Sequence, residues 1–195
     1  MYGNPAPTGS TDKEKYLEAQ ANITDSTILT NLKSWYDRVF TTDEAQNMLA
    51  DTIWCGDKSL ESGLGYGSTA STFGARLRVN TNKTPSLVCP DSGTDGMLSK
   101  YTAEDTTNGN GLLKTTTNGT TKYYKIGLLT ADEAAFAGGV FNVRNNTYYL
   151  YNGNAYWLLS PFYFNASRVR AGVWFVNSNG YLDYGIVTNG YGMRP

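Results

Sequence analysis

The residues best suited to specific chemistry gather at the C-terminal end of the chain, and the chemistry they suit is recognition. Between Tyr151 and Pro195 the sequence contains no Lys, Glu, Gln, His or Cys, and it uses Tyr, Asn, Ser, Trp and Arg instead. Tyrosine and tryptophan offer large contact areas at low conformational-entropy cost, and Ser, Gly and Asn offer adaptable hydrogen bonds. A solvent-facing segment of this composition is typical of a binding surface.

Within this segment, scaffold positions alternate with positions suited to contact. We expect Leu158, Val176, Leu182 and Val187 to be buried beneath one contiguous exposed surface. The expected ligand-binding residues share an outward position on that surface: Tyr163, Asn165, Ser167, Arg168, Arg170, Trp174, Asn177, Tyr181, Asp183, Tyr184 and Asn189.

Three of these positions carry alternatives. Trp174 lies in an apolar run, residues 173–176, and strand alternation leaves it either an exposed anchor or a core residue. Arg168 and Arg170 are two residues apart and share a strand face. That face is either an ordinary solvated face or a basic spot in a Tyr-rich surface, where arginine contributes strongly to binding.

The sequence lacks residues that several common catalytic sites require. The chain has no histidine, which removes Ser-His-Asp and Cys-His nucleophile systems and every zinc site that uses histidine. Glycoside hydrolysis needs two facing carboxylates, and residues 151–195 offer only Asp183. We therefore predict that the protein is not an enzyme.

No metal or cofactor is expected either. None of the carboxylates follows the D-x-D-x-D-G spacing of a calcium-binding loop. Asp132 and Glu133 are explained by the favourable interaction of acidic side chains with a helix N-terminus.

The charge balance limits the partners. Lys and Arg number 16 and Asp and Glu number 17, so the basic footprint of a nucleic-acid-binding protein is missing. No stretch approaches the roughly 18–20 apolar residues needed to cross a bilayer. The expected partner is therefore a protein or glycan on another cell or particle, with no nucleic acid and no membrane contact by this domain.

The two cysteines, Cys55 and Cys89, are either unrelated buried thiols or a disulfide that closes the loop between them. The surrounding composition is low in Lys and rich in Asn, Thr, Tyr and Gly, which resembles exported bacterial surface proteins, where disulfides persist. We predict the disulfide, worth about 3–4 kcal/mol in the chain-entropy model. The same reasoning predicts an extracellular location, on a cell surface.

The elements that must position the C-terminal segment include three helices. Asp25 and Ser26 are expected to cap an amphipathic helix that runs to Val39. Thr41-x-x-Glu44 and Thr130-x-x-Glu133 fit capping boxes that open two shorter helices, one through Met48 and one over 131–137.

The remaining pattern predicts strands and hairpins, and hence an α+β domain. Short strands are expected over 52–55, 75–79, 86–89 and 122–129, and antiparallel hairpins follow from Tyr148 onward. At 195 residues the chain suits one domain. Its expected parts are an N-terminal loop segment (1–24), a loop-rich insertion (56–121) and the ligand-binding region (151–195).

Several short motifs occur in the order of a known family. They are Trp35-Tyr36, Asp51-Thr52-x-x-Cys55-x-Asp57-x-Ser59, Cys89-Pro90, Gly127-Leu128-Leu129-Thr130-Ala131-Asp132-Glu133, Ala137-Gly138-Gly139, Trp157-x-x-Ser160-Pro161 and Gly192-x-Arg194-Pro195. Together they resemble a family of bacterial and phage surface domains with the C-type-lectin-like fold of the formylglycine-generating-enzyme superfamily. The enzymes of that superfamily rely on a C-terminal cysteine pair, and this chain has no cysteine after Cys89, so their activity does not carry over.

The resemblance extends to the variable proteins of diversity-generating retroelements, in which a reverse transcriptase rewrites adenines at the end of the gene. It implies a fixed scaffold and a diversified C-terminal surface. The function that follows is a receptor-like or adhesin-like domain that binds a protein or glycan. The alternative is a structural or adhesin module of a bacterial surface protein that is not diversified and whose C-terminal aromatic residues only pack.

Overall fold

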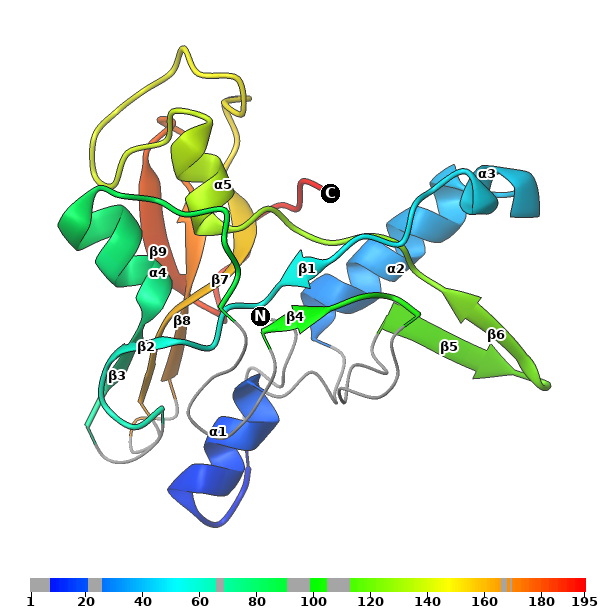
Figure 1. The fold of residues 1–195 in the computed structure, drawn as a ribbon, viewed down its shortest axis with the longest axis horizontal. Coiled ribbons are helices and arrows are strands. Elements are labelled where there is room, and N and C mark those ends of the chain that lie inside the picture. Colours follow the sequence, from blue (N-terminus) through cyan, green and yellow to red (C-terminus); the bar gives the residue numbers. More distant parts are fainter. Residues whose placement is uncertain are drawn as a thin grey trace.

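The centre of the molecule is a five-stranded antiparallel sheet with the strand order β2-β3-β7-β8-β9 (Figure 1). It is seen in a computed structural model that describes residues 8–20, 26–65, 69–90, 99–104, 113–165, 168 and 170–195. The strands of this sheet are β2 Leu60–Ser62, β3 Ser71–Phe73, β7 Tyr156–Asn165, β8 Arg170–Val176 and β9 Leu182–Ile186.

Helices and two small sheets surround the central sheet. The helices are α1 Asp12–Gln20, α2 Thr27–Val39, α3 Asp43–Asn47, α4 Gly74–Arg76, the π-helix η1 Leu77–Asn82 and α5 Ala131–Phe136. The small sheets pair β1 Trp54–Cys55 with β4 Lys100–Tyr101, and β5 Lys114–Thr117 with β6 Thr120–Tyr123. In Figure 1, α4 and α5 lie beside the central sheet, whereas α2, α3 and the β5–β6 hairpin lie on the other side of the molecule.

This mixture of helices and antiparallel strands confirms the α+β class. Within the part of the chain described above, no helix is both long and apolar enough to cross a membrane.

Both faces of β8 are buried, because helices cover both faces of the sheet. Val173 and Phe175 join the hydrophobic core that includes α2, whereas Trp174 and Val176 join the core that includes α4, η1 and α5. Trp174 is 0 % exposed, and its ring centroid lies 4.9 Å from that of Phe162. The prediction that Trp174 belongs to an exposed surface is therefore wrong, and the core alternative is correct.

The scaffold residues behave largely as expected. Leu158, Val176 and Leu182 are buried in the core on the α5 side of the sheet. Val187 is only half-buried and packs at the margin of the core on the α2 side.

The capping predictions are confirmed at α5 and displaced by one residue at α3. At α5, the hydroxyl of Thr130 accepts the N–H of Glu133 (3.1 Å) and the carboxylate of Glu133 accepts the N–H of Thr130 (2.7 Å). At α3 the cap is Thr42, whose hydroxyl accepts the N–H of Ala45 (3.2 Å). The Thr41 capping box is therefore wrong, although the helix that it predicted exists.

Three local predictions failed because tertiary contacts and capping outweighed the strand or loop pattern. Residues 86–89 form no strand; the N–H of Ser86 donates to Asp132, and Cys89 is held by the disulfide. The strand expected over 122–129 is present only to Tyr123, as part of β6. Residues 75–79 form α4 and the start of η1 instead of a strand, and Ala75 and Val79 pack into the core on the α5 side. Residues 12–20 form α1 instead of a loop. Its first turn is capped by the hydroxyl of Thr11, which accepts the N–H of Glu14 (3.2 Å).

The predicted disulfide joins Cys55 to Cys89, with their Cα atoms 5.7 Å apart. The region 56–121 is more than a loop-rich insertion, since it supplies β2 and β3 to one edge of the central sheet. The disulfide ties the start of this region to the stretch that follows η1.

Candidate functional site

The register of the central sheet brings two predicted binding residues, Tyr163 and Tyr184, together on one face. Tyr163 pairs with Gly172 on β8, and Tyr184 on β9 pairs with Trp174, two residues further along β8. Residues two apart on a strand share a face, so both tyrosines lie on the side of the sheet that carries α4 and α5. Their ring centroids are 6.0 Å apart in an edge-to-face arrangement.

An irregularity in β7 makes this contact possible. The register between β7 and β8 shifts between Pro161 and Tyr163, so that β7 carries one extra residue there. Phe162 and Tyr163 are neighbours in sequence, yet both rings reach Tyr184 because of this bulge. Phe162 stacks on Tyr184 with ring centroids 4.1 Å apart and planes 15° apart.

Gly172 provides the space for the ring of Tyr163. A Cβ atom at Gly172 would lie 2.3 Å from that ring, closer than any carbon contact allows. The ring therefore lies directly over the backbone of β8, and burial raises the pKa of the Tyr163 hydroxyl.

Arg168 and Arg170 lie at the β7–β8 end of the same face and are both exposed. Arg170 pairs with Asn165 in register, and the side chain of Asn165 accepts the N–H of Arg168 (3.0 Å). Both arginines lower the pKa of Tyr163, which opposes the larger effect of burial. Neither guanidinium forms an ion pair with any carboxylate in the described residues.

We call Tyr163, Arg168, Arg170 and Tyr184 the tyrosine–arginine face. Its border on the helix side is neutral, because Arg76 forms an ion pair with Glu61 there. The guanidinium of Arg76 also lies over the ring of Phe162, 5.7 Å from the ring centroid. The face itself therefore keeps the two positive charges of Arg168 and Arg170.

Asp183 and Asn189 do not belong to this face. Asp183 pairs in register with Phe175, which places it on the α2 side of the sheet, and its carboxylate accepts the N–H of Tyr184 (2.8 Å). The side chain of Asn189 donates to the hydroxyl of Tyr191 (3.3 Å), whose ring stacks on Phe175.

Asn177 and Tyr181 lie at the β8–β9 turn, at the other end of β8 from Arg170. The N–H of Asn177 donates to the carbonyl of Tyr181 (2.8 Å), and its side-chain oxygen accepts the N–H of Asn179 (2.9 Å). Ser167 lies outside the described residues.

The prediction of one contiguous exposed surface is therefore wrong in part. Of the eleven residues, the structure brings together the four of the tyrosine–arginine face, with Asn165 half-buried beside them. Asp183 and Asn189 lie on the opposite side, Asn177 and Tyr181 lie at the far turn, and Trp174 is in the core.

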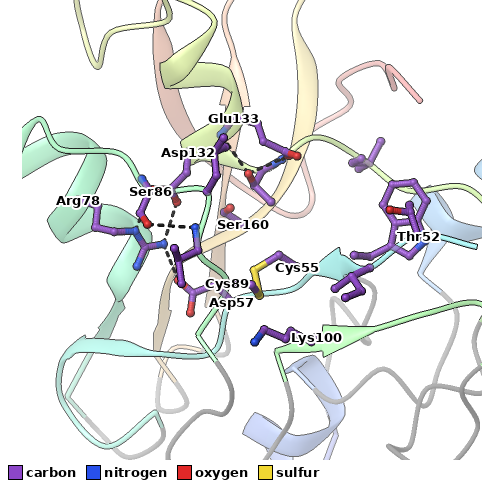
Figure 2. Close-up of a pocket in the computed structure, with 16 residues that line it drawn as sticks. Thr52, Cys55, Asp57, Arg78, Ser86, Cys89, Lys100, Asp132, Glu133 and Ser160 are labelled. Atoms are coloured by element: carbon purple, nitrogen blue, oxygen red, sulfur yellow. Dashed lines mark hydrogen bonds and ion pairs between the residues drawn. A yellow bond between two sulfur atoms is a disulfide. The ribbon is translucent and has the colours of Figure 1, made fainter.

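A pocket beside the disulfide is a second candidate site, which was not predicted from the sequence. It is a pocket of about 430 Å³ lined in part by the disulfide, Arg78, Asp132, Asp57 and Ser160 (Figure 2). Arg78 points toward both carboxylates in Figure 2. Its guanidinium donates twice to Asp132 (2.8 Å each) and once to Asp57 (2.7 Å).

The carboxylates of Asp57 and Asp132 each accept hydrogen bonds from Arg78 and from one backbone N–H group. Besides Arg78, Asp132 accepts the N–H of Ser86 (2.8 Å), and Asp57 accepts the N–H of Ser59 (2.8 Å). The hydrogen bonds that Arg78 donates to Asp132 and Asp57 raise the pKa of its guanidinium. The group holds together the segment after β1, η1 and α5, which suits a structural role.

Lys58 is buried next to this group and is 2 % exposed. Burial lowers its pKa to about 8, and the neighbouring charge of Asp57 opposes the shift. Among the residues that the structure describes, no three His, Cys, Asp or Glu side chains lie close enough together to hold a metal ion.

The amino-acid composition of residues 151–195 indicated a binding surface, but it did not indicate which residues belong to the tyrosine–arginine face. The bulge in β7 and the helices on both faces of the sheet decide which residues are exposed. Comparison with known proteins finds no family model, curated protein or solved structure that matches this chain.

Proposed function

We propose that this chain is an extracellular ligand-binding domain of C-type-lectin-like fold, which binds a protein or glycan through the tyrosine–arginine face. The observation that carries the proposal is the grouping of two tyrosine rings and two arginines without ion pairs among the described residues, on one side of the sheet. Tyrosine and arginine are enriched among the residues that dominate binding energies.

The rigidity of the support favours binding. Tyr184 stacks on Phe162, and Phe162 packs on the fully buried Trp174, so the exposed ring rests on two ordered aromatic layers. A side chain that is already ordered loses little entropy when a ligand arrives. Tyr184 nevertheless exposes 44 % of its surface and is available for contact.

The extracellular location is supported by the disulfide, since disulfides persist in oxidising compartments. The order of the elements agrees with the C-type-lectin-like resemblance: helices come first, a disulfide-closed region follows, and an antiparallel hairpin ends the chain. Diversification of the C-terminal surface by a retroelement is part of the same proposal. A near-copy of the end of the gene, beside a reverse-transcriptase gene, would test it.

The proposal assigns no catalysis to this chain. The carboxylates of Asp57 and Asp132 already accept hydrogen bonds from Arg78 and from backbone N–H groups. The carboxylate of Glu133 accepts the N–H and the hydroxyl of Thr130. These bonds support a structural role for all three carboxylates.

Capture on a panel of immobilised glycans and exported proteins tests the function. Tyr184→Ala and Arg170→Ala are expected to weaken capture of any panel ligand by about tenfold or more, because each removes a residue of a type that dominates binding. The matched controls are Tyr149→Ala, which removes a tyrosine that is 85 % exposed elsewhere, and Arg144→Ala, which removes another exposed arginine. If both face variants bind every captured ligand as the wild type does, the proposal fails.

A further inference from the structure

We propose that the tyrosine–arginine face recognises an acidic sugar, a six-membered ring that bears a carboxylate. The ring stacks on the open side of Tyr184, and the carboxylate is held by Arg168 and Arg170. This inference rests on the function proposed above and narrows it to one class of ligand.

The stacking position follows from the neighbours of Tyr184. Phe162 covers one side of the tyrosine ring, with parallel planes and centroids 4.1 Å apart. Tyr163 lies beside both stacked rings, with centroids 6.3 Å from Phe162 and 6.0 Å from Tyr184, so it does not cover the other side of Tyr184, a residue that is 44 % exposed. The apolar C–H face of a sugar ring placed there would continue the stack of Phe162 and Tyr184 as a third layer.

The preference for a negative charge follows from the charges around the face. Arg168 and Arg170 have no carboxylate partner among the described residues. Two acidic residues in the strands of the central sheet are committed elsewhere, Glu61 to Arg76 and Asp183 to the N–H of Tyr184 on the opposite side of the sheet. A guanidinium binds a carboxylate with two parallel hydrogen bonds, so an acidic ligand supplies the counter-charge that the face lacks.

Hydroxyl groups next to the tyrosines favour a sugar over an acidic peptide. Thr72 on β3 pairs in register with Tyr163, and Ser62 on β2 pairs with Thr72, so the hydroxyls of Ser62 and Thr72 lie on the same face of the sheet as the tyrosines. The hydroxyls of Ser62 and Thr72 lie 2.8 Å apart, and each retains capacity for a second hydrogen bond. A peptide rich in Asp and Glu would satisfy the arginines but offers no sugar ring to stack on Tyr184 and no ring hydroxyls for Ser62 and Thr72.

The test measures binding of the whole protein to defined probes at physiological ionic strength. The acidic probes are sialyllactose coupled to albumin and polygalacturonate, which distinguish the two sources of a carboxylated sugar. Their neutral counterparts are lactose coupled to albumin and the methyl ester of polygalacturonate, and the peptide probe is polyglutamate. We expect at least one acidic sugar to bind about tenfold or more tightly than its neutral counterpart and than polyglutamate.

Variants separate stacking from charge. The double variant Arg168→Gln/Arg170→Gln is expected to abolish the preference for the acidic over the neutral sugar, whereas the control Arg144→Gln is expected to keep it. Tyr184→Ala is expected to weaken binding about tenfold, and Tyr184→Phe to retain it, because the phenylalanine ring preserves the stack. Unchanged melting temperatures and circular dichroism spectra establish that each variant is folded.

Four outcomes would overturn the inference. Equal binding of acidic and neutral sugars would remove the role of the carboxylate, and polyglutamate binding that is insensitive to Tyr184→Ala would indicate charge attraction alone. Failure of every acidic sugar, while a neutral or protein ligand is captured through Tyr184, would refute the ligand class and leave the proposed function standing. If the face variants change no binding at all, both proposals fail together.

Discussion

Replacing Arg78 by methionine should destabilise the protein strongly, because it removes the only cation bonded to two buried carboxylates among the described residues. The side chains of Asp57 and Asp132 are 3 % and 5 % exposed, and that of Arg78 is 20 % exposed. Methionine fills much of the same volume but leaves three charge-assisted hydrogen bonds unmade.

The magnitude follows from the burial of the carboxylates. Removing one partner of a buried ion pair costs about 3–5 kcal/mol, because a charge is left without compensation. Here each carboxylate keeps one backbone N–H donor, and Arg78 is partly solvated, so we expect the lower end, about 3 kcal/mol. For a domain of this size that corresponds to a melting temperature lower by about 6–12 °C.

Urea unfolding with the disulfide intact measures the free energy of unfolding. Arg144→Met is the control, since a substitution at an exposed arginine is expected to stay within about 0.5 kcal/mol. Adding Asp132→Asn to Arg78→Met removes one of the uncompensated charges, so the double variant should be more stable than Arg78→Met alone. A loss below about 1 kcal/mol for Arg78→Met, or no recovery in the double variant, would refute the assignment of this cluster as a structural tie.

Three further perturbations test other features. The double variant Cys55→Ser/Cys89→Ser opens a loop with a sequence separation of 34, and urea unfolding should show a loss of about 4 kcal/mol in the chain-entropy model; a loss under about 1 kcal/mol would contradict it. The pKa of Lys58 is lowered from 10.5 to about 8, so between these pH values the unfolded chain binds more protons than the folded chain. The free energy of unfolding of the wild type, measured against that of Lys58→Met, should therefore rise with pH in this range by at most about 1.4 kcal/mol per pH unit. A difference between the two proteins that stays constant from about pH 7 to about pH 10 would contradict this. Gly172→Ala places a Cβ atom 2.3 Å from the ring of Tyr163, which must then move; we expect a destabilisation of about 1–3 kcal/mol and loss of ligand capture, and full capture would contradict the role given to that ring.

The features that could be predicted from the sequence are those fixed by neighbouring residues. The capping box of Thr130 and Glu133 joins residues three apart and needs no tertiary context. The disulfide followed from composition and from the presence of only two cysteines.

The exposure of β8 and β9 could be predicted only in part. Trp174 is buried because α2 covers one face of the sheet while α4 and α5 cover the other, an arrangement of segments far apart in the chain. The separation of Asp183 from Tyr184 was available from strand geometry alone, since adjacent residues on a strand point to opposite faces. The contact between Phe162, Tyr163 and Tyr184 depends on a bulge in β7, and its signal in the sequence is Pro161, because proline inside a central strand indicates a bulge.

The hydrogen bond from the N–H of Tyr184 to the carboxylate of Asp183 affects whether two molecules of this protein can associate. Leu182 donates its N–H outward to Val140, so the N–H of Tyr184, two residues later, also points away from β8, toward the outer edge of the sheet. An open edge of this kind invites strand pairing with a second chain. The carboxylate of Asp183 accepts that N–H and places a negative charge at the edge. A residue that was predicted to be part of a binding surface thus discourages aggregation of the protein, and Asp183→Val would be expected to reveal this as concentration-dependent self-association.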